Sequence, residues 1–286
     1  MKSEKPFSIR LMACDWGASV WLIELAGRTL LFDAWLDDPY FSGPAGFFSA
    51  HRSEPALFSA NSLPPVDALV LSSAEQDHAH PCTLAKLDRG IPVYARPEAA
   101  RLAARLGFAQ ITALAPGQRA QLWNGDASLL ALAGYGRNTP FVMREQATGE
   151  RVCIAQHGVN ARWLTKHSRS AFSGEFAPDA AGRLTDTLCI GVHTTLLRPL
   201  GLPRWVLGDA GTILPDPLES AAIVARFSPR RVLFSHATRE VEQGFAVRHL
   251  LRYPSAHDDL GHAQRAFREN APGPRIAGLP APAAWL

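Results

Sequence analysis

The sequence has few cysteines, and they are not arranged in pairs. The four cysteines, Cys14, Cys82, Cys153 and Cys189, lie far apart in a chain of 286 residues, and none belongs to a Cys-x-x-Cys motif. Disulfide frameworks are typical of small secreted chains with closely spaced cysteines, so this pattern argues against one. We expect reduced, mostly buried thiols and a cytoplasmic protein.

Long apolar runs and runs of basic residues are missing as well. No segment approaches the roughly 18 apolar residues of a membrane span. The charged residues 1–6 are not followed by an apolar core, so no signal peptide is expected. The formal net charge is only +3, from 29 basic and 26 acidic side chains, and the arginines are scattered. A nucleic-acid surface needs a denser basic patch, so we expect neither a membrane nor a nucleic acid as partner.

Apolar residues are abundant. Hydrophobic residues make up 47% of the chain and charged residues 19%, which predicts a sizeable core and argues against disorder. The length suits one large domain or two small ones. Because no repeat or linker divides the sequence, we predict a single domain over residues 1–286. Residues 271–286 are rich in proline and alanine and are expected to form a tail on the surface.

Short apolar segments alternate with turn signals along most of the chain, which favours an α/β fold. Strands are predicted over residues 7–13, 18–25, 28–33, 66–71, 91–95, 110–114, 120–123, 128–133, 141–145, 151–155, 188–192 and 231–234. Helices are predicted over residues 82–88, 97–106, 161–167, 217–227, 241–252 and 258–270. The strands between 110 and 155 are expected to form an antiparallel meander. Residues 37–65, interpreted as a flap over the site, and residues 168–187 are expected to be loops.

One stretch carries the functional hypothesis. The apolar strand at 66–71 runs directly into polar residues that include Asp77, His78 and His80. In an α/β fold, ligands bind at loops that leave the carboxyl ends of such strands. One carboxylate and two imidazoles within four positions are ligands that a zinc-type ion prefers. A polar surface loop with an ordinary histidine explains the same residues without a metal.

The same pattern recurs twice. The apolar strand at 151–155 runs into His157, and the strand at 231–234 runs into His236. A metal site whose ligands converge from several strand ends has this layout. Each histidine could instead satisfy its own strand end independently. The recurrence favours a shared site.

Three segments together resemble a known family. The sequences LSSAEQDHAHP at 71–81, VCIAQHG at 152–158 and RVLFSHA at 231–237 are similar to the metallo-β-lactamase superfamily of αββα sandwich hydrolases. The resemblance covers most of residues 8–240 and implies a four-layer αββα sandwich. The family signature after the first of these strands is His-x-His-x-Asp-His.

This chain departs from that signature in its first half. The signature positions read Ser73-x-Glu75-x-Asp77-His78, so the Asp-His half is kept and both leading histidines are absent. With His80 the local pattern becomes Asp-His-x-His, which resembles a divergent branch of the superfamily. In the family, the leading histidines and a mid-chain histidine hold one metal. The resemblance therefore implies that this first metal position is lost, because the matching region near 133–136 also lacks a histidine.

The second metal position of the family is held by the Asp-His pair and a C-terminal histidine. His236 matches that histidine, and His157 falls where the family has a bridging aspartate. The resemblance implies one ion, with Zn²⁺ the first candidate among divalent metals. The expected ligands are Asp77, His78, His157 and His236, and Glu75 or His80 is a candidate further ligand or a hydrogen-bond partner of a ligand.

The predicted function follows from the ion. A bound divalent ion lowers the pKa of water from 15.7 towards ~7 and polarises a carbonyl or phosphoryl oxygen. We therefore expect a metal-dependent hydrolase of a small-molecule ester, thioester, amide or phosphodiester, with Asp77 as candidate general base if it does not bind the metal. The alternative is a degenerate member that keeps the fold without catalysis and serves as a binding or scaffold protein. Convergence of the four expected ligands would favour the hydrolase.

Overall fold

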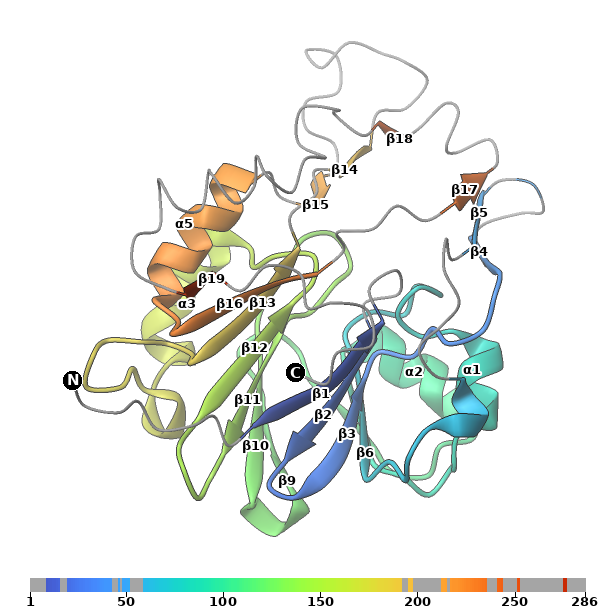
Figure 1. The fold of residues 1–286 in the computed structure, drawn as a ribbon, viewed down its shortest axis with the longest axis horizontal. Helices are drawn as coiled ribbons and strands as arrows, with labels where there is room; N and C mark the ends of the chain where they lie inside the picture. Colours follow the sequence, from blue (N-terminus) through green and yellow to red (C-terminus); the bar gives the residue numbers. More distant parts are fainter. Residues whose placement is uncertain are drawn as a thin grey trace.

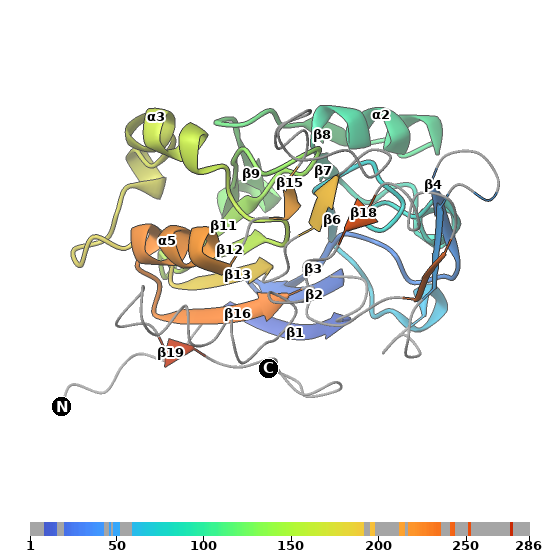
Figure 2. The same ribbon diagram turned by 90° about the horizontal axis from the view of Figure 1, so that it is seen from above.

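The computed structural model describes residues 9–15, 20–42, 46, 48–51, 59–191, 195–197, 212–214, 217–235, 241–243, 251–252 and 275–276. Two mixed β-sheets lie face to face, and helices cover the outer face of each (Figures 1 and 2). The predicted four-layer αββα architecture is confirmed.

The first sheet combines an antiparallel hairpin with parallel strands. Its order is β1 (Arg10–Asp15), β2 (Val20–Leu25), β3 (Arg28–Phe32), β6 (Ala68–Leu71), β7 (Val93–Ala95) and β8 (Ile111–Ala113). Ala26 and Gly27 have φ angles of 52° and 70°, which a two-residue hairpin turn between β2 and β3 requires. Strands β3, β6, β7 and β8 run parallel. Helices α1 (Pro81–Lys86) and α2 (Pro97–Arg105) cover the outer face.

The second sheet has a similar mixture. Its order is β19 (Arg275–Ile276), β16 (Arg231–Ser235), β13 (Thr187–Gly191), β12 (Arg151–Ala155), β11 (Phe141–Glu145), β10 (Ala127–Ala131) and β9 (Arg119–Leu122). Strands β9 to β12 are antiparallel, and β12, β13, β16 and β19 are parallel. Helices α3 (Ala161–Ala171) and α5 (Pro217–Phe227) cover it. Within the described ranges, no helix has the length and apolar character needed to cross a bilayer.

Shorter elements complete the described structure. One small sheet contains β15 (Thr212–Leu214), β14 (Thr195–Leu197) and β18 (Leu251–Arg252), and another contains β17 (Val241–Gln243), β5 (Phe48–His51) and β4 (Tyr40–Ser42). Single 3₁₀ turns occur at η1 (Ala60–Ser62), η2 (Trp123–Gly125) and η3 (Gly174–Phe176).

Apolar side chains fill each of the three spaces between layers. Leu30 and Phe32 of β3 point between the sheets, whereas Leu31 between them points towards the outer helices. Phe227 of α5 belongs to a third cluster outside the second sheet. The central strands are therefore buried on both faces, and this explains why they read as continuous apolar runs rather than as alternating patterns.

Three predictions about chain segments were wrong in part. The predicted meander fails at its first strand, because β8 follows helix α2 and pairs in parallel with β7 in the first sheet. Such a strand–helix–strand crossover produces parallel pairing. Strands β9 to β12 do form the predicted antiparallel series. The predicted loop at 168–187 begins too early, since α3 continues to Ala171 and η3 follows. Residues 37–65 contain β4, β5 and η1.

The predictions for the segment after residue 240 contained the largest errors. The predicted helix at 241–252 is wrong at both ends, where β17 pairs with β5 and β18 pairs with β14. Pairing with strands from distant parts of the chain overrides a weak helical preference. In the predicted surface tail, Arg275 and Ile276 pair with β16 instead. The helix predicted at 258–270 lies outside the described residues.

Candidate metal centre

Polar side chains gather at the carboxyl ends of β3, β6 and β12. The parallel strands β3 and β6 end at the same edge, so Asp33 and Ser72 become neighbours. The Ser72 backbone N–H and hydroxyl each donate a hydrogen bond of 2.7 Å to the Asp33 carboxylate. Asp33 has a φ of 58°, a left-handed conformation that aspartate tolerates better than most residues. The site therefore begins where two buried strands leave the sheet together.

The loop after β6 fixes His78. The backbone N–H groups of His78 and Ala79 both donate to the carbonyl of Glu75, at 3.0 and 2.8 Å, which closes a helical turn. The Ala34 N–H donates to the His78 carbonyl at 2.7 Å, and Ala34 and Ala79 form an isolated parallel bridge. This bridge continues the pairing of β3 and β6 beyond their ends. The His78 side chain is only 1% exposed, so its ring is held on all sides.

Three predicted ligands converge. Asp77, His78 and His157 each offer one ligand atom, and these atoms lie within 4.8 Å of one another. The Nε2 atom of His78 is 3.0 Å from Nε2 of His157 and 3.3 Å from Oδ2 of Asp77. His157 reaches this point because Gly158, with a φ of 73°, turns the chain sharply after β12. The donors therefore come from both sheets.

A network behind His78 turns its Nε2 atom towards His157 and Asp77. The Nδ1 atom of His78 is 2.8 Å from Oδ2 of Asp33, whose side chain is fully buried. Ser72 Oγ lies 3.2 Å from the same Nδ1 atom. A carboxylate behind Nδ1 fixes the orientation and tautomer of a histidine whose Nε2 binds a metal. Sequence analysis missed Asp33 and Ser72.

Charges inside this network are strongly coupled. Burial opposes a charge on His78, but the carboxylates of Asp77 and Asp33 outweigh it and raise the pKa of the imidazole well above its usual value. Burial raises the pKa of the Asp33 carboxyl, and the neighbouring His78 only partly offsets this. Without another cation, the centre is thus arranged to bind a proton at His78.

The donor set fits a divalent cation. Metal–nitrogen bonds of about 2.0–2.1 Å at a tetrahedral zinc ion place two nitrogens roughly 3.4 Å apart, close to the 3.0 Å between the two Nε2 atoms. One carboxylate and two imidazoles are also the ligand types that zinc and iron accept. The three ligand atoms lie close together, and a cation between them would take the place of the proton on His78.

Other predicted site residues lie elsewhere. His80 is the residue before α1, with Nε2 3.3 Å from the Pro39 carbonyl oxygen and Nδ1 3.4 Å from Thr83 Oγ1. Glu75 points outward, where its carboxylate lies 3.6 Å from the Arg137 guanidinium. Neither belongs to the clustered donors. The predicted fourth ligand, His236, lies outside the described residues.

The leading signature positions are also occupied differently from the family pattern. Ser73 is 1% exposed, and its hydroxyl accepts a hydrogen bond of 3.2 Å from the Glu75 N–H. A further polar residue that sequence analysis missed, Asn138, places Nδ2 3.4 Å from Nε2 of His78. It follows a turn after β10, and no motif in the neighbouring sequence marked it as a site residue.

Solved structures similar to this chain share its fold at low sequence identity. An isothiocyanate hydrolase from Delia radicum gut bacteria has a TM-score of 0.61 and 13% identity, covering 94% of this chain and 95% of that one. A possible metal-dependent hydrolase from Veillonella parvula DSM 2008 has a TM-score of 0.61 and 12% identity, covering 96% of each chain. At these identities the likeness concerns the fold alone.

A third similar structure is longer than this chain. CmlA, a diiron β-hydroxylase from Streptomyces venezuelae, has a TM-score of 0.61 and 17% identity over 97% of this chain. The present chain spans 54% of that protein, about half its length. A search of curated proteins gave no match.

A family comparison covers most of the chain. The sequence profile described as a β-lactamase superfamily domain matches residues 28–237, which include β3, the 72–80 loop and His157. The two facing sheets with outer helices, and the similar folds, agree with this match. With its donor cluster at the strand ends that the resemblance indicated, the chain belongs to the metallo-β-lactamase superfamily.

Proposed function

We propose that this protein is a metal-dependent hydrolase that holds one divalent cation through Asp77, His78 and His157, with His236 as fourth ligand. The observation that carries the proposal is the approach of three ligand atoms from two different sheets to within 4.8 Å of one another. Residues that only end their own strands have no reason to meet in this way. The bound ion would activate water and polarise a carbonyl or phosphoryl oxygen.

The protein's own residues have separable roles in this proposal. Asp33 accepts the Nδ1 hydrogen of His78 and so makes Nε2 the nitrogen that would bind the ion. His157 brings the second imidazole from the other sheet. Asp77 is 19% exposed, so it lies on the solvent side of the cluster and can either bind the ion or act as general base.

The substrate class is that of the hydrolytic reactions such an ion supports: a small-molecule ester, thioester, amide or phosphodiester. The similar folds include an isothiocyanate hydrolase and a diiron hydroxylase, so both zinc and iron belong in a test of the metal. We further propose that the protein acts in the cytoplasm, in line with its scattered cysteines.

Ser73 and Glu75 are the residues that support the alternative role as a non-catalytic scaffold. These residues occupy the leading signature positions, and neither is placed with the clustered donors. A scaffold has no need of a metal ion, so it should purify without zinc or iron. Metal content therefore separates the two roles.

The first experiment is elemental analysis of the purified protein. We expect about one equivalent of zinc or iron in the wild type and none in His78→Ala. The matched control is His80→Ala, which removes a buried histidine two positions away whose ring faces Pro39 and Thr83 instead. Loss of metal from both variants, or from neither, would contradict the assignment.

A second variant separates the two roles of Asp77. If Asp77 binds the ion, Asp77→Asn should lower metal affinity together with hydrolysis of a panel of model esters, thioesters and phosphodiesters. If it acts as general base, the variant should keep its metal and lose only turnover. A wild type that holds metal but hydrolyses nothing in the panel would favour the binding protein.

A further inference from the structure

Asn138 reaches the metal centre from the loop that connects β10 and β11. Its side chain is 5% exposed, and Nδ2 lies 3.2 Å from Ser72 Oγ and 3.4 Å from Nε2 of His78. None of the roles assigned above uses this amide, although it lies beside the nitrogen that would bind the ion. A buried polar side chain at such a position calls for a specific function.

The orientation of the amide follows from its partner. The Ser72 hydroxyl has one hydrogen, and it donates this hydrogen to Oδ2 of Asp33 at 2.7 Å. Ser72 Oγ can therefore only accept from Asn138, which places the NH₂ group rather than Oδ1 towards the site. An amide NH₂ offers no lone pair to a metal, so Asn138 is a donor at this centre and not a ligand.

The backbone holds this donor in place. The Thr139 N–H donates to the Ser72 carbonyl at 2.9 Å, which ties the loop to the His78 side of the site. The Asn160 N–H donates to the Ala133 carbonyl at 2.8 Å, which ties the other end of the loop to the His157 side. At Gly134 an added Cβ would lie 2.7 Å from the Asn138 carbonyl oxygen, so the close turn needs a glycine.

We propose that Asn138 binds an oxygen of the substrate through the second hydrogen of its NH₂ group. This inference rests on the proposed function, because a cation bound to Nε2 of His78 prevents that nitrogen from accepting a hydrogen bond from the amide. The hydrogen is then available to an oxygen that gains negative charge beside the ion. A donor held in position before the reaction stabilises such charge strongly. The substrate is then a carbonyl or phosphoryl compound, and a carboxylate product binds in the same place.

The test uses acetate as a probe and the protein loaded with Co²⁺, whose visible absorption changes when an anion binds near it. We expect Asn138→Ala to weaken acetate binding about tenfold to a hundredfold, the effect of losing one hydrogen bond to a charged group. Asn138→Leu, which keeps the volume of the side chain without a donor, should behave alike if the smaller variant does not fold. Both should keep the Co²⁺ stoichiometry and affinity of the wild type.

The matched control is Asn160→Ala. Asn160 lies in the neighbouring loop, but its side chain accepts from the Trp163 N–H at 2.9 Å and caps helix α3. This variant should lose thermal stability and bind acetate as the wild type does.

Unchanged acetate affinity in Asn138→Ala would overturn the inference while the metal site stands. Loss of Co²⁺ from the variant would also overturn it and would make Asn138 a positioning residue of the metal. A wild type that binds no Co²⁺ overturns both this inference and the proposed function.

Discussion

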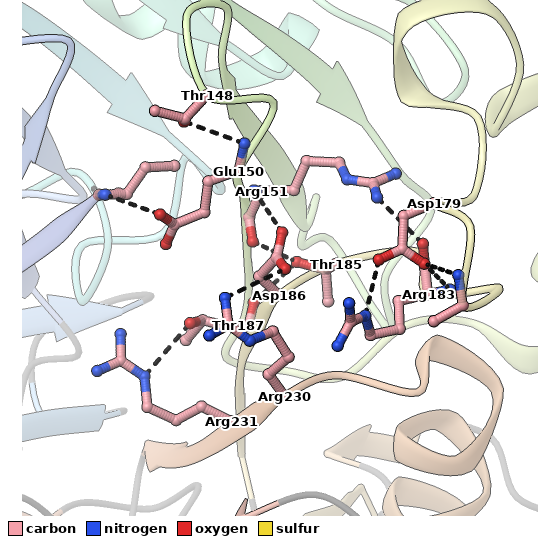
Figure 3. A network of polar contacts seen from close by, with 12 residues as sticks. Thr148, Glu150, Arg151, Asp179, Arg183, Thr185, Asp186, Thr187, Arg230 and Arg231 are labelled. Atoms are coloured by element: carbon pink, nitrogen blue, oxygen red, sulfur yellow. Dashed lines mark hydrogen bonds and ion pairs between the residues drawn. The ribbon is translucent and has the colours of Figure 1, made fainter. Parts of the chain in front are cut away.

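The two ends of strand β12 carry polar clusters of opposite character. At the amino end, Arg151 is 4% exposed, and its guanidinium donates to the backbone carbonyls of Ala177 and Arg183 at 2.7 and 3.2 Å (Figure 3). Its own N–H donates to the Asp186 carboxylate at 3.0 Å. At the carboxyl end, His157 meets Nε2 of His78 and the carboxylate of Asp77. A guanidinium meets backbone carbonyl oxygens at one end, whereas two imidazoles and a carboxylate, which can bind a proton or a metal ion, meet at the other.

This difference separates a structural network from a functional one. In Figure 3, Asp179 pairs with Arg183 at 2.7 Å, and Thr185 Oγ1 donates to the Arg151 carbonyl at 2.9 Å. These contacts hold the segment after α3 against the sheet, although the buried Nε of Arg151 has no hydrogen-bond partner among the described residues. The cluster around His78 gathers carboxylates and imidazoles that a cation would complete. Burial alone therefore does not mark a site, since both ends are buried; a group of side chains that can all bind the same cation does.

The largest expected effect comes from breaking the amino-end network. Arg151→Met keeps much of the apolar stem and the backbone N–H that bonds Asp186, but it leaves the buried carbonyls of Ala177 and Arg183 without the guanidinium donor. We expect the free energy of unfolding to fall by about 3 kcal/mol, because buried acceptors lose a charged donor. Urea unfolding of the metal-free protein measures this. Metal content should stay that of the wild type.

The matched control for this variant is Arg101→Met. Arg101 lies on α2, is 67% exposed and approaches Glu98 at 3.5 Å. Its replacement should change stability by less than about 1 kcal/mol. Loss of metal in Arg151→Met would show that the two clusters depend on each other and would remove the contrast between them.

A smaller effect is expected from the carboxyl end. Asp33→Asn keeps the shape of the side chain but removes the charge behind His78. We expect metal affinity to fall about 10- to 100-fold, the usual effect of changing a hydrogen-bond partner of a ligand. Competition with a chelator measures it. The control is Asp67→Asn, because Asp67 precedes β6 at its other end and its carboxylate accepts from the Thr29 N–H at 2.9 Å. Equal metal affinity in Asp33→Asn and the wild type would contradict the positioning role.

The smallest expected effect is a change of stability and metal affinity with pH. Asp77 and Asp33 raise the pKa of His78 well above its usual value in the metal-free protein. The stability that the charged ring contributes is thus complete below about pH 6.5 and is lost as the pH rises through the raised pKa. The metal-free wild type should have a higher free energy of unfolding in urea than His78→Gln, and this difference should decrease at alkaline pH. Metal affinity should rise with pH, because the proton competes for the same nitrogen.

The stability that the amino-end network contributes should not depend on pH in this way. Guanidinium groups stay charged across the range in which histidine titrates. The destabilisation by Arg151→Met should therefore be the same at pH 6 and pH 8. A pH-independent difference between wild type and His78→Gln would argue against the carboxylates as the cause of the raised pKa.

Local patterns in the sequence indicated the convergent donors but not their surroundings. Asp77, His78 and His157 were predicted because each follows an apolar strand. Asp33 follows Leu30, Leu31 and Phe32 in the same way, yet it was missed. Its importance depends on β3 lying beside β6, and strand order is not written in any local window. The same holds for Asn138, which lies between β10 and β11 of the second sheet. Its partners Ser72 and His78 follow β6 of the first sheet.

The architecture was predictable where apolar runs are long and was not where pairings are short. The two main sheets follow from buried strands that resemble the family in order and spacing. In contrast, β17 and β18 contain three and two residues, and each is specified only by a distant partner. A few residues carry too little pattern to outweigh a helical period, which is why residues 241–252 were predicted as helical.

The origin of the donors in both sheets has a consequence for the fate of the protein in a cell. His78 and His157 lie 79 positions apart, so one ion would crosslink the two halves of the sandwich. A ligand that binds only the native state protects it by mass action. Resistance to proteolysis, and with it abundance, would then follow the supply of free metal.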